Sequence, residues 1–206
     1  MTDQEKQSKK KRKKSLKRAL IEWAVLLVII GILWVTGWYK DLAAGMQQLV
    51  LKTGFVQASA HKKEAQTTAP YNFKLRSLDG KPFNFADLRG KTVFLNIWAS
   101  WCPPCIAEMP DIYQLYQEVH SKHIKFVMLS LDDDPEKAAR FIRRKGYDFP
   151  VYTQATPLPH AYSSKTIPTT FVISPQGKIV VKHTGMAAYN TNKFKKLLMD
   201  ITQTKN

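Results

Sequence analysis

The chain's two cysteines, Cys102 and Cys105, stand in the sequence WCPPC with two prolines between them. A thiol pair at this spacing can ligate zinc or Cu(I), form a structural disulfide, or exchange disulfides with other molecules. A structural zinc site needs four ligands, and the five histidines offer no convincing partner spacing. A disulfide that closes so short a loop restricts the unfolded chain little. Redox exchange and Cu(I) binding are therefore the two functions to weigh.

The residues on either side of the pair favour redox exchange. An apolar stretch, Thr92–Trp98, predicts a buried strand before the cysteines, and the apolar spacing from Pro103 to His120 predicts a helix after them. The N-terminus of a helix presents free N–H groups and a positive dipole end, which lower the pKa of a thiol placed there. We expect Cys102 to be the accessible attacking nucleophile, and the more buried Cys105 to resolve the mixed disulfide.

The prolines of the motif fit the first turn of that helix. Pro103 and Pro104 would occupy positions where a missing N–H breaks no helical hydrogen bond and where a fixed φ suits the helix start. The first free amide is then that of Cys105, close to the Cys102 sulfur. A further proline, Pro110, is expected to kink the helix.

The first seventy residues predict a membrane anchor. Residues 19–39 read ALIEWAVLLVIIGILWVTGWY, with Glu22 as the one charge, and as a helix they would span about 31 Å, close to the hydrocarbon core of a bilayer. We expect a basic cytoplasmic tail (1–18), a single-pass transmembrane signal-anchor helix (19–39) and a spacer (40–70). Nine Lys/Arg precede the span and two follow within twenty residues, which places the N-terminus in the cytoplasm and the catalytic domain in the periplasm or outside the cell.

The chain is strongly basic, with a formal net charge of +16. Residues 1–60 carry 11 Lys/Arg against 4 Asp/Glu, and residues 61–206 carry 21 against 12. The run from Lys9 to Lys14 lacks interleaved aromatic residues and a nucleic-acid-binding fold, so we interpret it as a topology signal and expect no nucleic-acid partner.

Residues 71–206 have the pattern of one α/β domain, large enough to bury its own core. The pattern predicts a hairpin at 73–85 around Asp79-Gly80, strands at 92–98 and 124–131, a helix between Asp134 and Gly146, a short strand at 149–154, a hairpin around Pro175-Gln176-Gly177, and a closing helix at about 191–201. This order predicts a central mixed sheet with helices on both faces. Asp132, Asp133 and Asp134 resemble a calcium-ligand run, but a loop that ends in a helix N-cap is favoured.

The motifs together resemble those of a known family. WCPPC after an apolar strand, Pro110, and the later TIPTTFVI are similar to a thioredoxin-fold oxidoreductase. From about Tyr71 to the C-terminus the chain resembles the membrane-anchored TlpA/ResA-like thiol-disulfide oxidoreductases, in GKPFNFADLRGKTVFLNIWASWC and in the extra helix and strand at 134–152. The resemblance implies a thioredoxin-like fold and an enzyme that needs no organic cofactor or metal.

The resemblance also implies a role for a carboxyl group near the cysteines. The thioredoxin pattern has an acidic residue six positions before the first cysteine, where this chain has Asn96. In this family Glu108 would take that role and hold the proton that Cys105 must lose. An ordinary exposed helix glutamate is the alternative.

Three further residues are expected at the site. Pro168 resembles the cis-proline that faces the dithiol in this fold, against the alternative of a trans proline that opens an edge strand. The backbone of Ile167 would then bind an extended substrate peptide. Trp101 is expected to shield the rim of the site, the alternative being an incidental surface tryptophan, and Trp98 is expected in the core.

The predicted function is a disulfide reductase that acts on disulfide-containing extracytoplasmic proteins, with cytochrome c maturation as one use. A dithiol in an oxidising compartment needs electrons to stay reduced, and the anchor would keep the domain beside a membrane-embedded donor. We expect a potential nearer about −270 mV than about −120 mV. The alternatives are a disulfide oxidase or isomerase, and a Cu(I)-handling protein to which Met109 and Met186 would contribute.

Overall fold

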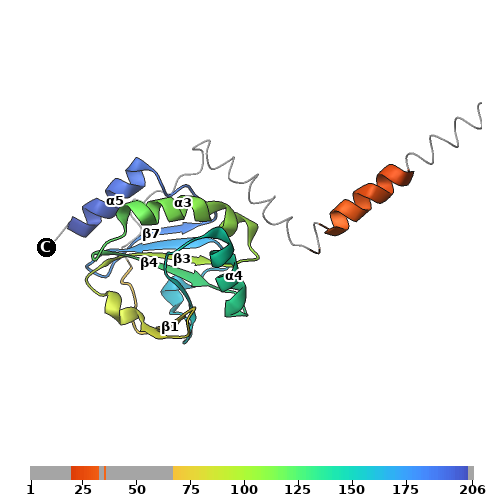
Figure 1. The fold of residues 1–206 in the computed structure, drawn as a ribbon. Coiled ribbons are helices and arrows are strands. Elements are labelled where there is room, and N and C mark those ends of the chain that lie inside the picture. Colours follow the sequence, from red (N-terminus) through yellow and green to blue (C-terminus); the bar gives the residue numbers. More distant parts are fainter. Residues whose placement is uncertain (1–19, 33–34, 36–66, 204–206) are drawn as a thin grey trace, which may run out of the picture. The chain divides into compact units, whose positions relative to one another are not determined.

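The computed structural model describes residues 20–32, 35 and 67–203. The chain divides into two compact units, Met1–Leu42 and Ala43–Asn206. In the first unit, residues 20–32 and 35 are helical (Figure 1). These residues are exposed. Within the described ranges, no helix has the length and apolar character needed to cross a membrane. The predicted tail, most of the predicted spacer (40–66) and residues 19, 33–34 and 36–39 of the predicted anchor lie outside those ranges.

The second unit contains a seven-stranded mixed sheet in the order β2-β1-β5-β4-β3-β6-β7. Its strands are β1 (Lys74–Ser77), β2 (Pro82–Asn84), β3 (Thr92–Trp98), β4 (Ile124–Ser130), β5 (Val151–Gln154), β6 (Thr169–Ile173) and β7 (Ile179–Thr184). Strands β3, β4 and β5 run parallel, and the remaining neighbours pair antiparallel. The predicted mixed sheet is confirmed.

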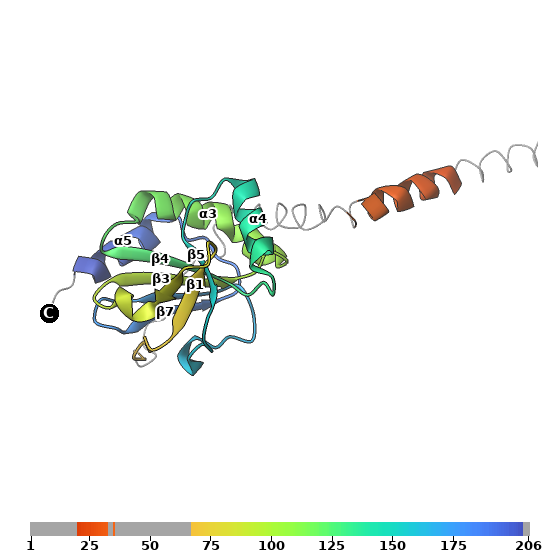
Figure 2. The ribbon, with the colours of Figure 1, turned by 60° about the horizontal axis from the view of Figure 1, so that its bottom comes forward.

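The helices of this unit cover the two faces of the sheet unequally. They are α3 (Pro103–Val119), α4 (Pro135–Lys145) and α5 (Asn192–Gln203), with the short 3-10 helices η1 (Phe85–Leu88) and η2 (His160–Tyr162). Side chains from α3, α4 and α5 all join one core cluster, whereas η1 and η2 contribute to the cluster on the other face (Figures 1 and 2). The crossovers β3-α3-β4 and β4-α4-β5 step the same way across the sheet, and right-handed connections then place both helices on one face. The prediction of helices on both faces therefore holds only through the 3-10 helices.

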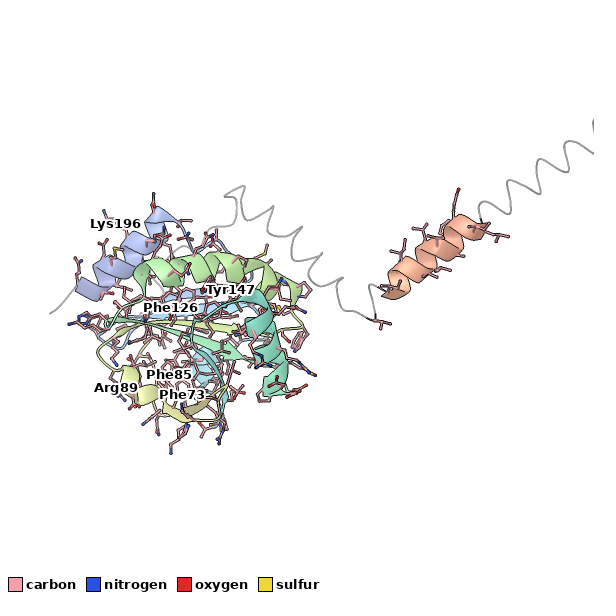
Figure 3. All side chains as sticks on the ribbon, viewed as in Figure 1. Phe73, Phe85, Arg89, Phe126, Tyr147 and Lys196 are labelled. Atoms are coloured by element: carbon pink, nitrogen blue, oxygen red, sulfur yellow. A yellow bond between two sulfur atoms is a disulfide. The ribbon has the colours of Figure 1, made fainter. Side chains whose placement is uncertain are left out.

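The central strand β3 supplies residues to both cores because its side chains alternate between the faces. Phe94 and Trp98 belong to the cluster under α3, and Leu95 and Ile97 belong to the other. Figure 3 shows the same division, with Phe126 between the sheet and α3, and Phe73 and Phe85 beyond the opposite face. All seven residues of β3 are buried. The strand that leads to the cysteines is thus fixed on both sides.

Local signals set the ends of several elements as predicted. Asp134 caps α4 by accepting a hydrogen bond from the Glu136 N–H at 3.0 Å, and Gly146 ends the helix in the left-handed region at φ 68°. The hairpins turn at Gly80 and Gly177, both with positive φ. Helix α3 continues through Pro110 to Val119.

Candidate active site

The cysteine pair lies where strand β3 passes into helix α3. Cys102 is the N-cap of α3, and Pro103 and Pro104 fill its first two positions. Cys102 and Cys105 form a disulfide, with their Cα atoms 5.3 Å apart. The Cys105 N–H donates to Cys102 Sγ at an N–S distance of 3.3 Å. The predicted arrangement, with the Cys105 amide as the first free donor of the helix, is confirmed.

The two sulfur-bearing residues differ in exposure less than expected. Cys105 is fully buried and Cys102 is 4% exposed, so the order of exposure is as predicted, but Cys102, the predicted nucleophile, is more shielded than expected. Both belong to the core cluster under α3. Trp101, immediately before Cys102, is 51% exposed and therefore marks the surface next to the disulfide.

The loop before β6 faces the disulfide from the other side. The Ile167–Pro168 peptide bond is cis, as predicted. The Ile167 carbonyl oxygen lies 3.8 Å from Cys102 Sγ. Antiparallel pairing of β6 with β3, in which Thr169 faces Ile97, brings the start of β6 to the end of β3 where the cysteines follow. A backbone carbonyl beside the reactive sulfur is where an extended substrate peptide would pair.

Glu108 is fully buried on the inner side of α3, one turn after Cys105. Asn96 Nδ2 donates to its Oε1 at 2.8 Å, and the Ala187 N–H donates to its Oε2 at 3.3 Å. Burial raises the pKa of Glu108 to about 8, against the opposing effect of these two hydrogen bonds. The alternative of an ordinary exposed glutamate is thereby wrong.

A chain of buried polar side chains extends from this carboxyl group. Asn96 Nδ2 also donates to Thr170 Oγ1 at 2.9 Å, and the Tyr189 hydroxyl donates to the same oxygen at 2.7 Å. Burial, followed by the charge of Glu108, raises the pKa of Tyr189 well above its ordinary value. Sequence reasoning missed Thr170, Tyr189 and Ala187. Only Thr170 carried a signal, because it lies in the TIPTTFVI motif and pairs directly with Asn96.

A second buried carboxylate, Asp132, holds the loop between β3 and the cysteines. Its two oxygens accept hydrogen bonds from the Ser100 N–H at 3.0 Å, the Ser100 hydroxyl at 2.7 Å and the Ser130 hydroxyl at 2.8 Å. The favoured interpretation of the acidic run is confirmed at Asp134, while the role of Asp132 was missed. The signal was its position just after β4, the parallel neighbour of β3.

A pocket of about 670 Å³ opens at the carboxyl ends of β3 and β4. Its wall includes Ser163 and Ser164, which lead along the chain to Ile167. Its lining residues within residues 67–203 are all uncharged: Ile97, Leu131, Gln154, Ala155, Thr156, Pro157, Leu158, Tyr162, Ser163 and Ser164. It therefore suits an uncharged group that approaches beside the cis-proline loop.

This arrangement defines a class: a thioredoxin-like fold with a helix-capping disulfide after the central strand and a cis-proline opposite it. The Redoxin family profile matches residues 64–198. Thiol-disulfide oxidoreductase ResA of Bacillus cereus (strain ZK / E33L) is 34% identical over 145 residues, covering 70% of this chain and 83% of the relative. ResA of Bacillus subtilis (strain 168) is 32% identical over 173 residues, covering 84% and 88%.

Solved structures agree with the sequence comparison. A thioredoxin-family thiol:disulfide interchange protein from Chlorobium tepidum TLS is 30% identical, with a TM-score of 0.58 over 68% of this chain and 99% of that one. A second Chlorobium tepidum protein, described as a putative DsbE, is 26% identical, with a TM-score of 0.59 over 68% and 99%. The chain therefore belongs to the Redoxin family and is a thiol-disulfide oxidoreductase of the TlpA/ResA-like group.

Proposed function

We propose that this oxidoreductase works as a disulfide reductase on extracytoplasmic proteins. The observation that carries the direction is that Cys102 Sγ has a single N–H donor, that of Cys105, within the described part of the chain. An N-cap side chain accepts from the second or third residue of its helix, and the second residue here is Pro104, which has no N–H. A thiolate with fewer donors is stabilised less, so the reduced form gives up its electrons more readily.

The reduction proceeds in two exchanges. The Cys102 thiolate attacks one sulfur of the substrate disulfide, forms a mixed disulfide with it and releases the other substrate sulfur as a thiolate, which takes a proton from water. The Cys105 thiol then loses its proton and attacks Cys102 Sγ, which releases the second substrate sulfur as a thiolate that also takes a proton from water. The substrate gains two electrons and two protons, and the enzyme is left with the Cys102–Cys105 disulfide.

Glu108 is proposed to receive the proton that Cys105 loses. Both residues are fully buried and lie one turn apart on α3, so water does not readily remove the proton. The structure holds the oxidised state, which follows that proton transfer. A pKa of about 8 in this state means that Glu108 carries a proton at neutral pH. When the disulfide is reduced again, the same proton would return to Cys105.

The substrate proposal rests on the surface around Cys102. The Ile167 carbonyl beside the sulfur and the uncharged pocket lined by Ser163 and Ser164 favour an extended polypeptide rather than a small charged thiol. We include among the substrates the C-x-x-C-H haem-attachment pairs reduced during cytochrome c maturation. A cysteine pair in a chain outside the cytoplasm is exposed to oxidation, and a reductase would return it to the two thiols.

The electron donor and location follow from the N-terminal sequence. We propose that residues 19–39 anchor the protein in the cell membrane, with residues 1–18 in the cytoplasm and the redox domain outside it. The helical, outward-facing apolar side chains of residues 20–32 support this proposal. Disulfide reduction outside the cytoplasm consumes electrons, and a membrane-embedded dithiol protein is the class of donor that an anchored domain reaches.

Two measurements test this function. Equilibrating the full chain, in detergent, against glutathione and dithiothreitol buffers gives its potential, expected nearer about −270 mV than about −120 mV. A value above roughly −170 mV would assign an oxidase or isomerase instead. Expressing Cys105→Ser in a cell membrane should trap substrates on Cys102 as mixed disulfides, and Cys102→Ser is the matched control. Equal recovery with both variants would contradict the assigned order of attack.

The Cu(I) alternative has less support among the described residues. Met109 is fully buried in the core cluster, and Met186 packs against the same cluster. Their thioethers therefore contribute to packing. Stoichiometric Cu(I) binding without disulfide turnover would reverse this assignment.

A further inference from the structure

Only the nitrogen of the Asn96 side-chain amide makes hydrogen bonds within the described residues. It is fully buried, and its Nδ2 hydrogens go to Glu108 Oε1 at 2.8 Å and Thr170 Oγ1 at 2.9 Å. Its Oδ1 is also buried and has no hydrogen-bond partner among the residues that the structure describes. A buried acceptor left without a donor is unfavourable, and such an atom in a native structure calls for an explanation.

The surroundings of Glu108 suit a carboxylate but not a carboxylic acid. Oε1 faces Asn96 Nδ2 and Oε2 faces the Ala187 N–H, so both oxygens meet donors. A protonated carboxyl group has one O–H, which needs an acceptor. Neither hydrogen-bond partner of Glu108 offers one as arranged. Yet the proposed function requires Glu108 to carry a proton after each turnover.

The other groups around Glu108 do not resolve this conflict. On α3, Cys105 is in the disulfide, and Asp111 accepts hydrogen bonds from the backbone N–H groups of Tyr189 and Asn190. From the segment after β7, the Tyr189 hydroxyl donates to Thr170. Strands β3 and β6 contribute Asn96 and Thr170, which are uncharged. The remaining acceptor within this network is the unpartnered Asn96 Oδ1.

We propose that the Asn96 side-chain amide rotates about its Cβ–Cγ bond, so that Oδ1 and Nδ2 exchange places, when Glu108 gains or loses its proton. In the orientation seen here, Nδ2 donates to the Glu108 carboxylate and to Thr170. In the reversed orientation, Oδ1 would accept from the Glu108 O–H and from the Thr170 hydroxyl, while Thr170 still accepts from Tyr189. Because the amide oxygen and nitrogen are similar in size, the reversal needs no repacking, and the atom at the position without a partner changes from Oδ1 to Nδ2.

Asn96 would thus be a positioning residue that serves both protonation states of the acid, a role that rests on the proton transfer proposed for Glu108. No other common side chain of this size offers a donor from one end and an acceptor from the other. An aspartate at this position would place a second carboxylate against Glu108, and a leucine would provide neither donor nor acceptor.

NMR of the oxidised full chain in detergent tests the proposal. The Glu108 carboxyl carbon and the Asn96 side-chain NH₂ group are followed from pH 5 to pH 10. We expect the Asn96 resonances to move with the same midpoint as the Glu108 carbon, and the Asn96 shift to vanish in Glu108→Gln. In Tyr189→Phe the shift should persist, because that variant keeps every partner of both amide orientations.

The outcomes separate this proposal from the one it rests on. A titrating Glu108 with unmoved Asn96 resonances would overturn the amide reversal and leave the proton transfer in place. A Glu108 carbon that does not titrate in this range would overturn both. In Asn96→Leu the Glu108 midpoint should stay near its parent value, because the variant removes both the donor to the carboxylate and the acceptor for the acid. A midpoint that moves to higher pH would mean that Asn96 acts only as a donor in a fixed orientation, and would overturn the reversal.

Discussion

Two buried carboxyl groups flank the cysteine motif, and their surroundings differ. Asp132 accepts three hydrogen bonds, from the Ser100 N–H and from the Ser100 and Ser130 hydroxyls. Glu108 accepts two, from Asn96 and Ala187, and is completely buried, whereas Asp132 is 7% exposed. Asp132, with more hydrogen-bond donors, holds the loop in place. Glu108, with fewer donors and one turn from Cys105, is suited to exchange a proton.

The largest effect that this contrast predicts is on the second exchange step. In Glu108→Gln, loss of the proton acceptor should slow release of substrate from the Cys102 mixed disulfide by about 10²-fold or more. In the unsubstituted enzyme this step should quicken as the pH rises through the titration of Glu108, and in the variant that rise should be absent. Stopped-flow release from a preformed mixed disulfide measures both. A retained pH profile in Glu108→Gln would remove Glu108 from the chemistry.

The second prediction concerns stability. The pKa of Glu108 is about 8 in the folded oxidised state against an ordinary value of 4.5, so between these values the unfolded chain releases a proton that the folded protein keeps. Stability should therefore fall as the pH rises from 4.5 to 8, by about 5 kcal/mol in all.

The matched variant for this prediction is again Glu108→Gln. Glutamine does not ionise, so any cost of its amide is the same at every pH. The free energy of unfolding of the variant, relative to that of the parent protein, should therefore rise across that window. Urea unfolding of the two oxidised proteins at pH 5 and pH 8 measures it. A difference that does not change with pH would mean that burial does not raise this pKa.

Asp132→Asn, unlike Glu108→Gln, should affect stability and leave the proton transfer unchanged. An amide keeps the shape of the side chain but turns one acceptor oxygen into a donor that faces the Ser100 or Ser130 groups. We expect a loss of about 1–3 kcal/mol of stability, with the pH profile of the second exchange step unchanged. Urea unfolding and the same stopped-flow assay decide this. A shifted profile would show that Asp132 takes part in proton transfer as well.

The contrast between the carboxylates also shows where sequence reasoning stops. The start of α3 was predictable because its determinants are local: Pro103 and Pro104 occupy the first turn, and Cys102 is left as the cap. The cis bond before Pro168 was predictable from the TIPTT motif. Such features need only a few neighbouring residues or a motif that carries its own conformation.

The donors to the two carboxylates were not predictable in this way. Glu108 receives hydrogen bonds from Asn96 and from Ala187, which lies 79 residues further along the chain. Asp132 meets Ser100 only because β3 and β4 are parallel neighbours. Such contacts depend on the pairing of strands, which no periodicity within one segment fixes. The shielding of Cys102 is of the same kind, since the core cluster that surrounds it is built from distant elements.

Cys102 Sγ resembles Glu108 in having few hydrogen-bond donors. Cys102 Sγ receives one backbone N–H, from Cys105, and Pro104, at the other position from which an N-cap side chain can accept, has no N–H. Pro104→Ala would restore that N–H at a position helical backbone already occupies, so the fold should tolerate it. One more hydrogen bond to the thiolate, worth about 1.5–3 kcal/mol, would stabilise the reduced form and raise the potential by roughly 30–60 mV.

Equilibration with glutathione measures the shift, and Pro110→Ala, further along the same helix, is the matched control. An unchanged potential in Pro104→Ala would mean that the number of amide donors does not set the direction of electron flow. The proposed reductase function would then rest on the proposed membrane anchor alone.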